Sequence, residues 1–210
     1  MIGISKLYCG AVEPADVLRY NRHSGQLPSH LLQFSADKRP VVVWNMTRRC
    51  NLKCIHCYSN SDNINYPDEL TTEEGKKLID DLAQFGSPVI LFSGGEPFLH
   101  KDLIPLLGHA DTKGFSVHIT TSGYTIPRKM INDLPDNAFL VFSLDGIGKV
   151  HDEYRGMPGA YERLIESLEY TRTKLKFNEI VSILWKGNIV QLDAKRFARI
   201  PESAMKRFGM

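Results

Sequence analysis

The sequence predicts an α/β fold in which parallel strands are joined by helical crossovers. Between residues 41 and 186, apolar runs of four to six residues alternate with segments whose apolar residues recur at helical spacing. Polar loops that carry glycine or cysteine follow these apolar runs. Because this alternation is typical of a parallel sheet, either closed like a barrel or open, we expect the functional residues at the carboxyl ends of the strands.

Five strands are predicted from runs rich in apolar and β-branched residues. Residues 41–46 form the first, and they are apolar on both faces, as expected for a strand that is covered from both sides. The other four strands are expected at residues 89–92, 115–120, 138–143 and 180–185.

A helix is predicted in each connection between these strands. Residues 71–74 have the sequence of a capping box, and the helix that they open ends at Gly86. The second helix runs from Leu103 to Lys113 and is closed by Gly114. The third and fourth helices are expected at residues 126–134 and 161–174.

Length and composition favour one ordinary globular domain. The chain has 210 residues, 42% of them hydrophobic, which suffices for a substantial core. The formal net charge of +2 is too small to favour nucleic-acid binding, so no DNA partner is expected. No apolar run is long enough to cross a bilayer, and residues 1–6 lack the apolar centre of a secretory signal. We therefore expect a soluble cytoplasmic protein with no membrane partner.

The charge is unevenly distributed along the chain. From residue 174 to residue 210 there are eight Lys or Arg and three Asp or Glu, a net charge of +5, which leaves −3 for the remainder. We divide the chain into an N-terminal extension at 1–39, a core of about five βα units at 40–188 and a basic C-terminal tail at 189–210.

Three of the four cysteines lie in one short run after the first predicted strand. Cys50, Cys54 and Cys57 have the spacing Cys-x3-Cys-x2-Cys. If three thiolates from one loop hold a [4Fe–4S] cluster, one iron keeps an open coordination position. An open position is the mark of a catalytic metal site.

The cysteines alone leave other interpretations open. A disulfide framework is disfavoured, because three crowded thiols and the distant Cys9 make a poor set of crosslinks. A zinc site of Cys3His type is the main alternative, with His56, His100 or His118 as the fourth ligand.

Polar loops follow the other predicted strands as well. They occupy residues 93–97, 121–123 and 143–146, and together with the cysteines they predict one active site at one rim. In the sequence Gly94-Gly95-Glu96-Pro97, the glycines would let the backbone approach a ligand closely, and Glu96 offers a carboxylate for an ammonium group. The alternative is a tight turn with a surface acid.

These features together resemble the radical S-adenosylmethionine (SAM) superfamily. Its cluster motif has the same cysteine spacing with an aromatic residue before the last cysteine, here His56, and its glycine-glycine-glutamate-proline motif matches residues 94–97 one strand later. The resemblance covers about residues 40 to 188. It implies a partial (βα) barrel of radical SAM type, incomplete at the C-terminal end, and an oxidoreductase or lyase that cleaves SAM reductively to a 5′-deoxyadenosyl radical.

The resemblance also implies roles for individual residues. Cys50, Cys54 and Cys57 would be the metal ligands, and with Glu96 they would form the catalytic set. The loop of Gly94, Gly95 and Glu96 would hold the amino group of SAM. The remaining cofactor contacts would come from His56 near the adenine, from Ser143 and Asp145 at the ribose or carboxylate, and from Asn188.

The substrate is suggested by a narrower likeness. Residues 6–10, 19–24 and 39–47 resemble the haem-biosynthesis branch, which includes didecarboxysiroheme deacetylase and the haem d1 biosynthesis proteins. This implies removal of acetate side chains from a siroheme-derived iron tetrapyrrole, with an electron donor such as flavodoxin or ferredoxin. Residues 151–156 recur in peptide-modifying relatives, so a peptide maturase is the alternative.

The chain also departs from the superfamily. Relatives of this branch continue through a sixth strand into a C-terminal extension with further cysteines, whereas no cysteine follows Cys57 here. We therefore expect a C-terminal truncation. Two interpretations of other classes follow, namely an inactive truncated fragment and a zinc-stabilised binding module.

Overall fold

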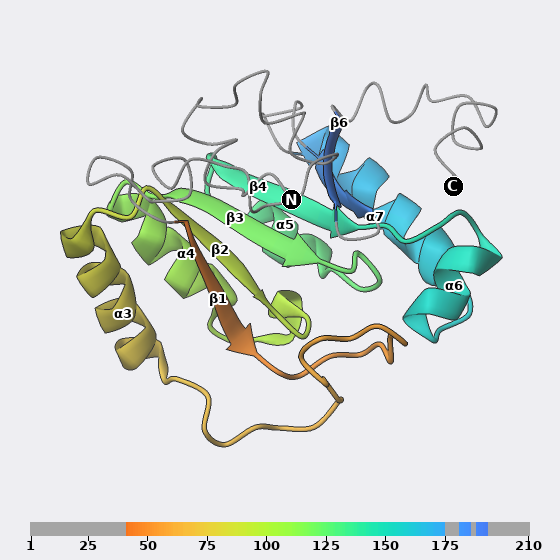
Figure 1. The fold of residues 1–210 in the computed structure, drawn as a ribbon. Helices are drawn as coiled ribbons and strands as arrows, with labels where there is room; N and C mark the ends of the chain where they lie inside the picture. The colour runs from red at the N-terminus through yellow and green to blue at the C-terminus, as the bar shows by residue number, and fades with distance from the viewer. Residues whose placement is uncertain (1–40, 175–180, 186–187, 193–210) are drawn as a thin grey trace, which may run out of the picture.

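The fold is built on a single sheet with strands in sequential order. The computed structural model describes residues 41–174 and the backbone of residues 181–185 and 188–192 (Figure 1). The described sheet has the order β1-β2-β3-β4-β5-β6; its first five strands are parallel, and β6 is antiparallel to β5. The strands are β1 (Val42–Thr47), β2 (Val89–Gly94), β3 (Ser116–Thr121), β4 (Ala138–Ser143), β5 (Val181–Trp185) and β6 (Asn188–Leu192).

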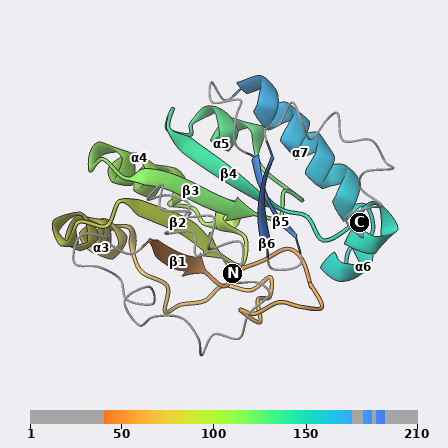
Figure 2. The same ribbon diagram turned by 45° about the horizontal axis from the view of Figure 1, so that its top comes forward.

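Helices connect the parallel strands and cover one face of the sheet. Figures 1 and 2 show α3, α4, α5 and α7 along this face, with α6 beyond the carboxyl end of β4. Sequential order with a helix in each crossover is the arrangement of a βα barrel, so the predicted α/β class is confirmed. The helices are α3 (Thr72–Phe85), α4 (Leu103–Thr112), α5 (Arg128–Asn132), α6 (Lys149–Arg155) and α7 (Ala160–Lys174), with a short 3₁₀ turn, η4 (Pro97–Leu99).

The hydrophobic core lies between the sheet and these helices. Phe92, Ile119 and Phe142 project from neighbouring strands and are fully buried against Leu107 and Leu164 of the helices. Alternate residues of β3 and β4 face the opposite side of the sheet, which leaves Thr120 and Ser143 free to line a cavity. The core therefore fixes the strands whose ends carry the polar loops.

The first helix begins and ends as predicted. Thr71 Oγ1 accepts a hydrogen bond from Glu74 N, and Glu74 Oε2 accepts one from Thr71 N, so the capping box is formed. Gly86 ends the helix in the left-handed conformation, with φ of 84°.

Three elements differ from the prediction. β1 lies at the edge of the described sheet and Val43 is 52% exposed, so the expected cover on both faces is wrong for this side chain. α6 was not predicted, because buried polar side chains replace the usual apolar stripe. Asn188 begins β6 and pairs with Trp185, so an antiparallel hairpin that was not predicted follows the fifth strand.

Two further observations concern the length of the helices. The third helix is shorter than predicted, since only residues 128–132 are helical. Within the part of the chain that the structure describes, no helix has the length and apolar character needed to span a membrane.

Candidate functional site

A cavity lies at the carboxyl ends of β1 to β4. Its lining includes the three thiols of Cys50, Cys54 and Cys57, the loop glycines Gly94 and Gly95, residues 120–122 after β3, and Ser143 after β4. The four polar loops that the sequence placed at one rim therefore share one cavity, as predicted.

The three cysteines carry free thiols in different environments. Cys50 is buried, Cys54 is half-buried and Cys57 is exposed. Burial is the main reason why the pKa of the Cys50 thiol is raised to about 11. Burial also acts to raise the pKa of Cys57, but hydrogen bonds from Ser59 and Ser61 outweigh it and lower this pKa below its ordinary value. Metal binding would have to displace the proton of Cys50, as a bound cation does.

The donor set fits an iron–sulfur cluster better than a single zinc ion. Tetrahedral zinc, with Zn–S bonds of about 2.3 Å, requires sulfurs about 3.8 Å apart. Among the described residues, no three His, Cys, Asp or Glu side chains gather closely enough to hold one metal ion. Soft thiolates that face a common cavity are the ligands of the wider four-iron cluster.

The imidazoles proposed for the zinc alternative have other partners. His56 Nε2 lies 3.5 Å from Asp145 Oδ2. His100 Nδ1 accepts a hydrogen bond from Asp102 N, and His118 lies near Ser116 at the opposite end of β3. Of these three histidines, only His56 lines the described cavity.

The glycines of the second loop bring its backbone against the cysteine loop. Gly95 N donates to Thr47 O at 2.7 Å, and Glu96 N donates to Arg49 O at 2.8 Å. A Cβ at Gly94 would lie 2.1 Å from Thr47 O, and one at Gly95 would lie 2.3 Å from Arg49 O. Gly94 also has φ of 127°, which L side chains rarely adopt. The close approach expected for a ligand is therefore made to the chain itself.

Glu96 is fully buried beneath this loop. Its carboxylate accepts hydrogen bonds from Thr121 Oγ1 (2.8 Å), Ser122 N (2.9 Å), Ser122 Oγ (2.6 Å) and Phe98 N (3.3 Å). Burial raises the pKa of Glu96, and these hydrogen bonds act in the opposite direction. The alternative of a surface acid is wrong, because Glu96 is 0% exposed. Its contact with SAM stays a prediction.

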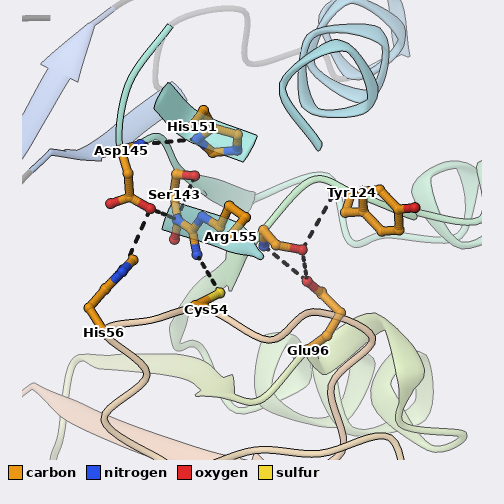
Figure 3. A network of polar contacts seen from close by, with 9 residues as sticks. Cys54, His56, Glu96, Tyr124, Ser143, Asp145, His151 and Arg155 are labelled. Atoms are coloured by element: carbon orange, nitrogen blue, oxygen red, sulfur yellow. Dashed lines mark hydrogen bonds and ion pairs between the residues drawn. The ribbon is translucent and has the colours of Figure 1, made fainter. Parts of the chain in front are cut away.

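An ion-pair network lies next to Cys54, on the side away from Glu96 (Figure 3). Arg155 Nη2 donates a hydrogen bond to Ser143 O at 2.8 Å. The same nitrogen lies 2.7 Å from Asp145 Oδ2, and this second contact is an ion pair that lacks the alignment of a hydrogen bond. Arg155 Nη1 donates to Cys54 Sγ at 3.6 Å. The predicted residues Ser143, Asp145 and His56 are thus brought together, with Asp145 behind the cavity lining.

Sequence reasoning assigned no role to Arg155 or His151. Asp145 N donates to His151 Nδ1, and burial together with the charge of Arg155 lowers the pKa of His151 to about 4, so its ring is neutral at pH 7. The only sequence signal was the motif at residues 151–156, which carries both side chains. The side chain of Asn188 lies outside the described structure, so its cofactor role stays a prediction.

Comparison with curated proteins identifies relatives in haem biosynthesis. The chain is 59% identical over 170 residues to Fe-coproporphyrin III synthase of Methanosarcina barkeri, and the aligned region covers 80% of this chain and 43% of that protein. It is 38% identical over 129 residues to pre-heme d1 synthase of Dinoroseobacter shibae, and this aligned region covers 60% of this chain and 32% of that protein. The chain thus spans less than half the length of these relatives.

Solved structures show the same fold at low identity. Streptococcus suis SuiB bound to S-adenosylmethionine matches with a TM-score of 0.54 and 20% identity over 63% of this chain and 31% of that chain. Native anSMEcpe with bound AdoMet matches with a TM-score of 0.55 and 18% identity over 69% of this chain and 42% of that chain.

The family model described as the Radical SAM superfamily matches residues 44–188. This range holds the three cysteines, the glycine loop and the ion-pair network, and it exceeds half of the chain. The chain therefore belongs to the radical SAM superfamily, whose enzymes use a [4Fe–4S] cluster and SAM, as the sequence predicted.

Proposed function

We propose that the chain provides the radical SAM core of an enzyme of haem biosynthesis whose substrate is an iron tetrapyrrole. The observation that carries this proposal is the shared cavity of Cys50, Cys54, Cys57 and the Gly94-Gly95 loop. The printed names of the relatives support the substrate class, since they are synthases of an iron coproporphyrin and of a haem precursor.

The bound groups would supply the radical chemistry. When bound, the cluster would relay one electron from an external donor to SAM, and this pair would supply the reductive C–S cleavage and the hydrogen abstraction from the substrate. The chain's residues would hold and orient these groups and exclude water. The three thiolates would bind iron, and Gly94 and Gly95 line the same cavity.

Glu96 would act in this site from a buried position. A direct contact with the ammonium group of SAM requires the carboxylate to exchange one of the hydrogen bonds from Thr121 or Ser122. Without that exchange, Glu96 would hold the backbone of its own loop and of the Ser122 loop in place. His56, Ser143 and Asp145 are the proposed contacts of the remaining parts of SAM.

The finer proposal for the reaction is removal of acetate side chains from didecarboxysiroheme. This substrate and the product named for the 59% identical relative are both iron tetrapyrroles. The cytoplasmic location and a flavodoxin or ferredoxin as donor stay predictions.

Anaerobic reconstitution tests the proposal in two stages. With iron, sulfide, dithionite and SAM, we expect a [4Fe–4S] cluster and formation of 5′-deoxyadenosine. With didecarboxysiroheme added, we expect a product whose mass shows loss of acetate side chains. A bound cluster without SAM cleavage would identify an inactive fragment. SAM cleavage without a new tetrapyrrole would refute the deacetylation and direct the search to peptide substrates.

A further inference from the structure

Arg155 joins the cysteine loop to the end of β4. It is the last residue of α6, and its guanidinium contacts the Cys54 sulfur, the Ser143 carbonyl oxygen and the Asp145 carboxylate (Figure 3). Within residues 41–174, no other charged side chain donates a hydrogen bond to one of the three cysteine sulfurs.

The neighbouring backbone fixes where this side chain can reach. Ile55 N donates to Tyr154 O at 3.0 Å, so the loop is hydrogen-bonded to the residue before Arg155. A Cβ at Gly156 would lie 2.3 Å from Lys53 O, so the residue after Arg155 also contacts the loop. Three consecutive residues of α6 and its cap therefore meet residues 53–55, with Arg155 opposite Cys54.

The guanidinium is buried, and Nη2 is the nitrogen that contacts both Asp145 and the carbonyl oxygen of Ser143. The side chains of Arg155 and Asp145 are 9% and 11% exposed. Arg155 Nε has no hydrogen-bond partner among the described residues. A buried charge is costly unless it is paired, so a purely structural role would favour a fully satisfied guanidinium. Instead, one of its two terminal nitrogens is directed at sulfur.

We propose that Arg155 is a positioning residue that fixes the Cys54 thiolate and raises the reduction potential of the cluster. The inference rests on the proposed function, because it concerns the cluster that the three cysteines would bind. Reduction adds a negative charge, and hydrogen bonds or positive charge at a ligand sulfur stabilise the reduced state. Asp145 lies on the far side of the guanidinium from Cys54, so the positive end of this ion pair is directed at the sulfur.

The test measures the potential of the cluster in the full chain. Arg155→Met removes the charge and the N–H···S bond, and Arg155→Lys keeps the charge without the planar guanidinium. Arg163→Met, in the exposed part of α7, is the matched control. The readouts are iron and sulfide content, circular dichroism and a redox titration followed by electron paramagnetic resonance.

We expect a more negative midpoint for Arg155→Met and a smaller shift for Arg155→Lys. At a fixed potential near the wild-type midpoint, the ratio of reduced to oxidised cluster should fall about tenfold in Arg155→Met, which for one electron corresponds to about 59 mV. Arg163→Met should have the wild-type midpoint.

A double variant separates the sulfur contact from the loss of charge balance. Arg155→Met leaves Asp145 without its guanidinium partner, with only His56 nearby at 3.5 Å, so we combine it with Asp145→Asn. We expect the midpoint of the double variant to stay below that of the wild type. Wild-type midpoints in Arg155→Met and in the double variant, at full iron content, would overturn the proposal. If neither variant retains the cluster but both have the circular dichroism spectrum of the wild type, the result supports the role of Arg155 in positioning Cys54. If both variants have lost the fold, the proposal is overturned. Failure of the wild-type chain to bind a cluster would refute the proposed function instead.

Discussion

The contact between the glycine loop and the cysteine loop gives the sharpest prediction on stability. In Gly95→Ala, the new methyl group would lie 2.3 Å from Arg49 O and 2.8 Å from Arg48 O. Both neighbours are backbone atoms, so the cysteine loop itself must shift. The shift lengthens two hydrogen bonds, from Gly95 N to Thr47 O and from Glu96 N to Arg49 O.

The magnitude follows from these two contributions. Overpacking costs about 1–3 kcal/mol, and each weakened hydrogen bond costs about 1 kcal/mol. We therefore expect Gly95→Ala to lower the free energy of unfolding by about 3–5 kcal/mol. The displaced loop should also retain less iron after reconstitution.

Urea denaturation and iron analysis measure both effects. Gly108→Ala is the matched control, because a Cβ at this position in α4 meets nothing within 4 Å. It should leave iron content unchanged and raise the free energy of unfolding by about 0.4–1 kcal/mol. If Gly95→Ala unfolds within about 0.5 kcal/mol of the wild type and binds a full cluster, the close approach is not required.

Three further predictions test other parts of the site and fold. Cys54→Ala should abolish cluster assembly and formation of 5′-deoxyadenosine, and retained SAM cleavage would show that the cysteine assignment is wrong. Glu96→Ala should retain the cluster but weaken SAM binding measured by calorimetry, and unchanged SAM affinity would contradict the Glu96 role. It should also lower the free energy of unfolding by about 1–3 kcal/mol, because the donors of Ser122 and Thr121 lose their acceptor. Burial lowers the pKa of His118 from 6.5 to about 4, so the unfolded chain binds more protons between these values and stability falls as pH decreases through that window. Urea denaturation should show a loss of unfolding free energy between pH 7 and pH 5 to which His118 contributes about 2 kcal/mol, in addition to the contribution of His151, whose pKa is lowered in the same way. The loss should be smaller by about that amount in His118→Gln, and an equal loss in both proteins would refute the assignment.

Local signals in the sequence were sufficient for most of the fold. The capping box at Thr71 and the left-handed Gly86 depend on neighbouring residues alone, so both ends of α3 could be predicted. The shared rim followed from a general property of parallel strands, whose carboxyl ends meet at one edge. These features needed no knowledge of which distant residues come into contact.

The parts that were missed depend on distant contacts. α6 begins after Gly148 without a side-chain cap, and its buried residues are His151 and Arg155, so apolar periodicity could not indicate it. Its partners are the carbonyl of Ser143 and residues 53–55 of the cysteine loop. The antiparallel return of β6 is likewise a matter of pairing rather than of local pattern.

The glycine motif shows the same limit at the level of a single site. Its pattern indicated a close approach of the backbone, but it could not indicate whether the approaching group is a ligand or another loop. The structure places Thr47 O and Arg49 O there. Glu96 was expected to offer its carboxylate to an ammonium group, and only the three-dimensional arrangement reveals its donors Thr121 and Ser122 at the end of β3.

The cysteine loop is therefore held from two sides by contacts of different kinds. The Gly94-Gly95 loop hydrogen-bonds to residues 47 and 49, before the first cysteine, while α6 meets residues 53–55 around the second. The first set of contacts is made by backbone alone and is linked through Glu96 to the loop after β3, so it can transmit a displacement of Ser122 to the metal ligands. The second adds the guanidinium of Arg155, so it can change the electrostatic potential at Cys54 as well as its position. A variant of Gly95 should thus alter cluster retention, whereas a variant of Arg155 should also alter cluster potential.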